Sequence, residues 1–162
     1  MQWQSSSGLS PLLPFAFIVF GCAAGLAQTQ TAALEPDHDR TVLAQSFAQE
    51  KLWAWQKRLN LKEWNITLLV ARASELKPKT LGNVHWDMDK KTAIIRILDP
   101  ADYKLPFKAM LDDMEFTVVH ELIHLDIAPV LTDLKRNEAN RREEEYSVNR
   151  VTEALLGLDR QK

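Results

Sequence analysis

The chain has 162 residues, a formal net charge of −2 and 26% charged residues, a size and composition typical of one soluble globular domain. Its balanced charge excludes the strongly basic surface on which nucleic-acid binding depends. The only cysteine is Cys22, which excludes an intramolecular disulfide and a cysteine-based zinc site. Any metal site must therefore use histidine and carboxylate ligands.

The N-terminal segment predicts export. Residues 12–27 form an apolar stretch that is too short for a comfortable membrane span. Small residues close this stretch at the positions that a signal peptidase reads, so we expect a signal peptide over residues 1–27 and a polar spacer over residues 28–40. Acylation of Cys22, as in a bacterial lipoprotein, is an alternative. We expect a protein of the periplasm, the cell envelope or the extracellular space, which meets the membrane only through an uncleaved or lipidated N-terminus.

The first half of the remaining chain predicts one helix and three strands. Thr41 is a candidate N-cap for a helix that ends near Asn60, because apolar residues recur behind it at intervals of three to four. Apolar and polar side chains alternate over residues 64–70, as in a half-buried strand. Residues 84–88 and 93–98 alternate in the same way on either side of a short turn, and together they predict a hairpin.

The second half predicts two helices. Apolar residues over positions 107–125 mark one stripe of a helix that we expect to end near Ile127, because Pro129 opposes its continuation. A last helix is expected to begin within residues 137–141. We expect its inward side chains to be those of Val148, Val151, Leu155 and Leu158. The elements together predict a single α+β domain over residues 41–158, with a small antiparallel sheet of about three strands between the first helix and the last two.

A short motif within the predicted helix points to a metal. Residues 120–124 read HELIH, an H-E-x-x-H pattern. His120 and His124 lie one helical turn apart and project only about 40° apart, a spacing that suits two ligands of one cation. Glu121 stands beside them and can reach a water on the metal without itself binding the metal. This geometry suits a zinc-bound nucleophile and its proton acceptor.

Two histidines leave a catalytic zinc ion one protein ligand short. His38 lies in the polar segment before the first helix, and His85 alternates away from the apolar face of its strand. The acidic run at residues 143–145 is therefore the better source of a third ligand. Periodicity alone favours Glu144, at the centre of the apolar stripe, whereas Glu145 sits about 100° to one side. A metal lies at the edge of a core, so both glutamates remain possible.

The same residues resemble a known family. HELIH followed 21 residues later by Glu145 and the sequence YSVN resembles the gluzincin metallopeptidases, and residues 145–156 are similar to a helix of minimal zincins. The resemblance covers about 40 residues on two helices. It implies that Glu145 is the third ligand and that Asn149 orients a ligand histidine. Val148 stands where the family usually has alanine, and Asn149 where larger gluzincins have aspartate.

These observations predict a zinc metallopeptidase acting on a peptide or protein. One zinc ion held by His120, His124 and Glu145 would polarise a bound water and the scissile carbonyl. Glu121 would take the proton of the water and return it to the leaving amine. The donor that stabilises the oxyanion stays open among three candidates: Tyr103, Tyr146 and His85.

Two other functions fit the same motif. One is a zinc amidase that acts on cell-wall peptides, which the expected export makes reasonable. The other is a metal-stabilised binding module of the cell envelope without turnover, which the small size of the chain favours. Imidazole and carboxylate ligands suit zinc best among the divalent ions, but they do not by themselves select it.

Overall fold

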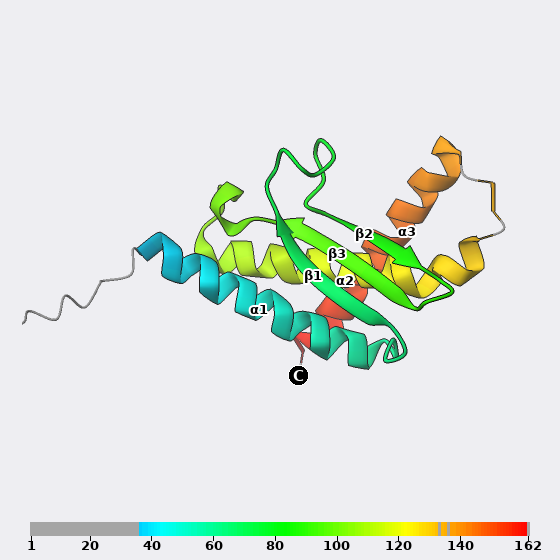
Figure 1. Ribbon diagram of the computed structural model, residues 1–162, viewed down its shortest axis with the longest axis horizontal. Coiled ribbons are helices and arrows are strands. Elements are labelled where there is room, and N and C mark those ends of the chain that lie inside the picture. Colours follow the sequence, from blue (N-terminus) through cyan, green and yellow to red (C-terminus); the bar gives the residue numbers. More distant parts are fainter. Residues whose placement is uncertain (1–35, 133, 136, 162) are drawn as a thin grey trace, which may run out of the picture. The chain divides into compact units, whose positions relative to one another are not determined.

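The computed structural model describes residues 36–132, 134–135 and 137–161, so the expected signal peptide lies outside the described residues. The elements in chain order are α1 (Pro36–Arg58), β1 (Asn65–Ala71), β2 (Gly82–Asp87), β3 (Thr92–Leu98), the 3₁₀ helix η1 (Pro100–Asp102), α2 (Phe107–Leu131) and α3 (Glu138–Asp159). The predicted α+β layout is confirmed, with one helix before a three-stranded sheet and two long helices after it (Figure 1). Among the described residues, no helix is both long enough and apolar enough to cross a bilayer.

Helix α1 begins earlier than expected. It starts at Pro36, so Thr41 lies inside the helix rather than at its N-cap, and the end of the expected spacer at residues 28–40 is helical. Proline suits a first helical position because its φ is already helical and it has no N–H that would need a partner there. At the other end, Asn60 has a φ of 58°, the left-handed conformation that commonly stops a helix.

The sheet is mixed, with strand order β1-β3-β2. Strands β2 and β3 pair antiparallel, as the predicted hairpin requires. Strand β1 pairs with β3 in parallel, with Asn65 opposite Thr92 and Ala71 opposite Leu98. The expectation of a wholly antiparallel sheet is therefore corrected at β1. Alternation along a strand reports which face is buried, whereas it carries no information about which strand lies alongside or in which direction.

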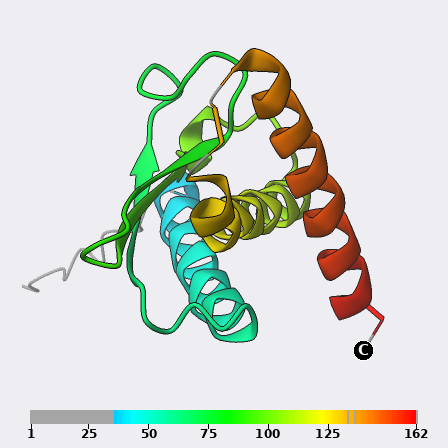
Figure 2. The same ribbon diagram turned by 90° about the vertical axis from the view of Figure 1, so that its right-hand side faces the viewer.

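Helix α2 is the central element. Figure 2 shows it between the sheet and α3, and it also packs along α1. Val119 and Ile123 are buried in addition to the expected stripe, because a helix covered on several sides needs apolar residues on several faces. A buried contact ties the first two helices together: Glu115 of α2 accepts from the indole Nε1 of Trp55 and pairs with Lys51, both at 2.9 Å.

Helix α2 also runs past its expected end near Ile127, to Leu131, with Pro129 inside its last turn. A proline this close to the end disrupts fewer hydrogen bonds than one in the middle of a helix. The hydroxyl of Thr132 donates to the carbonyl of Ala128 at 3.0 Å and so satisfies one of the terminal carbonyls.

Helix α3 turns only part of the expected row toward the core, because Val148 is buried and Leu155 packs partly buried against the core, whereas the other two residues do not. Its buried residues are spaced four apart: Val148, Thr152 and Leu156. Val151 and Leu158, expected to point inward, are 44% and 62% exposed. The row follows the i, i+4 ridge that helices commonly pack together. Extended toward the N-terminus of the helix, this row of residues reaches Glu144, while Glu145 lies to one side of the row. The rotation of α3 about its axis therefore decides which of the two glutamates faces which side chain of α2.

Candidate metal centre

Three ligand-type side chains converge where α2 meets α3. The Nε2 atoms of His120 and His124 lie 3.0 Å apart. The Oε2 atom of Glu145 lies 3.3 Å from the first and 3.5 Å from the second. The histidine side chains are largely buried, whereas the Glu145 side chain is 49% exposed, so the cluster sits at the edge of the core. This His/His/Glu group can hold a metal ion.

Glu144 lies on the opposite side of the His124 ring. Its Oε1 is 3.0 Å from the Nδ1 of His124, and its side chain is only 9% exposed. In the tautomer with the proton on Nδ1, the ring donates to this carboxylate and turns a free Nε2 toward the cluster. Of the two glutamates that the sequence leaves open, Glu145 therefore faces both Nε2 atoms and Glu144 holds the His124 ring.

The surroundings of His120 favour its neutral form on balance. Burial lowers the pKa of His120 and the neighbouring His124 lowers it further, while Glu145 and Asn149 act in the opposite direction. The neutral imidazole is the form that binds a cation. Its Nδ1 is buried without a hydrogen-bond partner among the described residues. Asn149, expected to orient a ligand histidine, lines the same pocket as His120.

Glu121 lines the same pocket as the three ligand-type side chains and is not part of their group. It is only 6% exposed. Burial is the main cause that raises the pKa of Glu121 to about 8; the negative charge of Glu145 raises it too, and a hydrogen bond from the backbone N–H of Val84 opposes both. A carboxylate whose proton affinity lies near neutrality suits proton transfer in either direction.

Gly82 allows β2 to approach α2 beside Glu121. A Cβ atom at this position would lie 2.5 Å from Cγ2 of Thr117 and 2.8 Å from the carbonyl oxygen of Arg96, both closer than real contacts allow. It would also stand 3.2 Å from Oε1 of Glu121. Gly82 was not among the predicted site residues, although glycine within a strand is a known signal of close backbone approach.

Substitution of Gly82 by alanine should therefore destabilise the fold. We expect Gly82→Ala to lower the free energy of unfolding by about 1–3 kcal/mol, because the added methyl meets backbone as well as a side chain. Urea denaturation measures this. Gly157→Ala is the matched control: no atom lies within 4 Å of the added Cβ, and alanine in a helix should stabilise by about 0.5–1 kcal/mol. Equal effects from the two substitutions would contradict the packing described at Gly82.

The cluster lies in a pocket of about 540 Å³, a volume typical of small-molecule sites. Its walls are β2, the loop over residues 72–81 that precedes this strand, α2, and the first half of α3. None of the three expected oxyanion donors lines it. Tyr103 is mostly buried, and burial together with the charge of Asp113 raises its pKa. The other two are exposed: Tyr146 and His85.

His38, the other histidine considered as a third ligand, is exposed in α1 and is absent from the group of ligand-type side chains. No protein-family model, curated protein or solved structure matches this chain. The resemblance to gluzincins therefore rests on the motifs of two helices and stays a prediction.

Proposed function

We propose that this chain is an exported, zinc-dependent peptide-bond hydrolase of the gluzincin type. The observation that carries the proposal is the convergence of two imidazole nitrogens and one carboxylate oxygen beside a second, buried carboxylate that is not part of the group. Three protein ligands and a separate proton acceptor are what a catalytic zinc site needs.

The spacing of the three ligand atoms supports zinc and a single ion. A tetrahedral zinc ion with bonds of about 2.0–2.1 Å keeps neighbouring ligand atoms about 3.3 Å apart. The three separations among His120, His124 and Glu145 are 3.0, 3.3 and 3.5 Å, which bracket this value. Two imidazoles and one carboxylate are also a common donor set for catalytic zinc. Glu144 supports the same assignment, because it orients one ligand without competing for the ion.

The chemistry divides between the ion and Glu121. When bound, the ion supplies Lewis acidity, which activates water and polarises a carbonyl group. Glu121 accepts the proton of the attacking water on its carboxylate and later returns it to the leaving amine. Glu121 lines the pocket with only a small part of its side chain exposed, which is where a proton acceptor for a water in the pocket must lie.

Strand β2 offers the main chain of a substrate a place to bind. Leu98 N–H donates to the carbonyl of Leu81 at 2.8 Å, so these two residues form a hydrogen-bonded pair. Bonded and non-bonded pairs alternate along an antiparallel ladder, so Gly82 and Val84 direct their backbone groups toward the open edge of β2, where the Val84 N–H meets Glu121 and the backbone groups of Gly82 face a peptide. Among the described strands, none covers this edge. An extended peptide that adds to it would pass the carboxylate of Glu121.

Chelator-sensitive hydrolysis tests the proposal. The purified chain, loaded with one equivalent of Zn²⁺, is incubated with a denatured protein mixture and, separately, with purified cell-wall peptide fragments. We expect new peptide N-termini from the protein mixture, loss of this activity with 1,10-phenanthroline, and recovery when Zn²⁺ is added back. Cleavage of the wall fragments alone would favour the amidase. Bound metal with no hydrolysis of either substrate would favour the binding module and overturn the proposal.

A further inference from the structure

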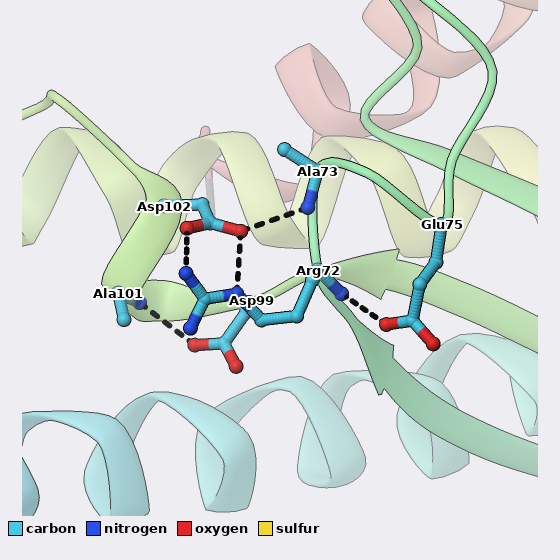
Figure 3. Close-up of polar contacts among 6 residues, drawn as sticks. All are labelled: Arg72, Ala73, Glu75, Asp99, Ala101 and Asp102. Carbon is cyan, nitrogen blue, oxygen red and sulfur yellow. Dashed lines mark hydrogen bonds and ion pairs between the residues drawn. The ribbon is translucent and has the colours of Figure 1, made fainter.

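The loop over residues 72–81, between β1 and β2, is held firmly where it leaves β1. The guanidinium of Arg72 donates to both carboxylate oxygens of Asp102 in η1, at 2.9 and 2.6 Å (Figure 3). The same carboxylate accepts from the backbone N–H of Ala73 at 2.8 Å. Glu75 accepts from the backbone N–H of Arg72 at 2.7 Å. The first residues of the loop are thus clamped to the end of the sheet.

The far part of the loop is a defined turn. Leu76 is only 6% exposed and packs with Leu98 beside β1. The carbonyl of Lys77 accepts from both the N–H and the hydroxyl of Thr80, at 3.1 and 2.8 Å. Lys79 takes a φ of 66°, so the chain turns sharply between them. This turn sets where the side chains of Lys77 and Lys79 leave the backbone, and both line the pocket of the metal cluster.

Arg141 lines the same pocket from α3. The side chain of Asn137 caps this helix by accepting from Asn140 N–H at 2.8 Å, which defines the first turn that carries Arg141. Figure 2 shows the start of α3 and the loop over residues 72–81 at the same end of the structure. Among the described residues, no acidic side chain forms an ion pair with any of the three lining cations: Lys77, Lys79 and Arg141.

The carboxylates that line the pocket face other groups than the three cations. Glu145 faces the two histidines, Glu144 holds the ring of His124, and Glu121 is buried against β2. Among the described residues that line the pocket, three are cationic and three carry carboxyl groups, so a bound divalent ion leaves an excess of at least two positive charges. The whole chain has a net charge of −2. The loaded pocket would thus attract an anion against the charge of the rest of the surface.

We infer that the pocket selects a peptide that carries a carboxylate close to the bond that is cleaved, and that Arg141, Lys77 and Lys79 bind this carboxylate. The inference rests on the proposed function. Arg141 supplies a planar pair of donors that matches a carboxylate, and the two lysines supply point charges from the opposite wall. The carboxylate is that of an acidic side chain or that of a free C-terminus, two sources with the same chemistry.

Matched peptides test the inference. One peptide of a sequence that the zinc-loaded chain cleaves is made with Glu or Gln at each position near the scissile bond, with blocked ends, and again with a free or an amidated C-terminus. We expect the kcat/KM to be at least tenfold higher for one Glu peptide than for its Gln twin, or for the free acid than for the amide. Which pair differs identifies the source of the carboxylate. Equal rates for all pairs would overturn the inference while leaving hydrolysis itself intact.

Variants assign the preference to the pocket. Arg141→Ala and the double variant Lys77→Ala/Lys79→Ala should each bring the ratio between the paired peptides toward one, with the neutral peptide still cleaved. Arg142→Ala is the control, because Arg142 is the next residue, is exposed like Arg141 and does not line the pocket. Raising NaCl from about 0.05 to about 0.5 M should reduce the ratio by screening. An unchanged ratio in both pocket variants would contradict the assignment.

A binding measurement separates this inference from the proposed function. Fluorescence anisotropy follows dye-labelled Glu and Gln peptides as they bind the zinc-loaded Glu121→Gln variant, in which turnover is not required. We expect at least tenfold tighter binding of the acidic peptide, and loss of this difference when Arg141→Ala is added. Selective binding without any hydrolysis by the parent chain would remove the proposed function and keep the anion site. Hydrolysis without selective binding would do the reverse.

Discussion

Replacement of Glu121 by glutamine is expected to abolish hydrolysis while metal remains bound. Glutamine has the size and shape of glutamate, so it fills the same buried space and its carbonyl oxygen can still accept from the Val84 N–H. It cannot take a proton from water. We expect kcat to fall by about 10²- to 10⁴-fold, the usual contribution of a general base. Steady-state kinetics measures the loss, and elemental analysis of the same sample measures the metal.

Glu143→Gln is the matched control for this substitution. Glu143 is exposed on α3 and is not among the described residues that line the pocket. It should leave both kcat and metal content at the parent values. If Glu121→Gln hydrolysed substrate at the parent rate, the assignment of Glu121 as proton acceptor would be wrong. If the variant lost its metal, Glu121 would be a ligand rather than a base.

Alanine substitutions of the three consecutive glutamates at residues 143–145 should weaken metal binding in a fixed order. Glu145→Ala removes a ligand atom, and we expect its dissociation constant for Zn²⁺ to rise by more than about 100-fold. Glu144→Ala leaves all three ligands but frees the His124 ring, and we expect a rise of about 10- to 100-fold, as is usual for a residue that orients a ligand. Glu143→Ala should have no effect. Competition with a chromophoric chelator measures all three constants.

The order of these effects is the informative result. A larger loss for Glu144→Ala than for Glu145→Ala would mean that Glu144 is the ligand and that the two side chains exchange roles when metal binds. Equal affinity in all three variants would mean that no glutamate from α3 reaches the ion. Glu144→Gln refines the test, because an amide oxygen can still accept from the His124 Nδ1–H and should restore much of the affinity that alanine loses.

Local pattern was enough to predict most of the secondary structure. The helix that carries HELIH could be predicted because apolar side chains recur along it with a helical period, and the β2–β3 hairpin because side chains alternate on both sides of a short turn. The parallel neighbour of β3 could not be predicted. Alternation along residues 65–71 is the same whichever strand lies beside them and whichever way it runs.

The ligand-type residues also divide into those that the local sequence could predict and one that depended on tertiary packing. A single helix places His120 and His124 relative to each other and to Glu121, and the geometry of that helix is known before any tertiary structure forms. Glu145 belongs to another helix. A rotation of α3 by one residue, about 100°, would exchange it with Glu144, and periodicity of the apolar residues favoured that exchange. The packing of Val148 and Thr152 against α2 decides the rotation.

The sequence by itself determined the chemistry that this chain can offer: two histidines and a glutamate on one helical face, acidic side chains on the next helix, and no cysteine within the domain. These properties depend on residue identity and on distances along one helix. Only the tertiary structure decided which carboxylate completes the group, why Gly82 stands beside Glu121, and which cations share the pocket. Each of those contacts joins segments far apart in the chain, whose mutual orientation arises from packing and leaves no local signal in the sequence.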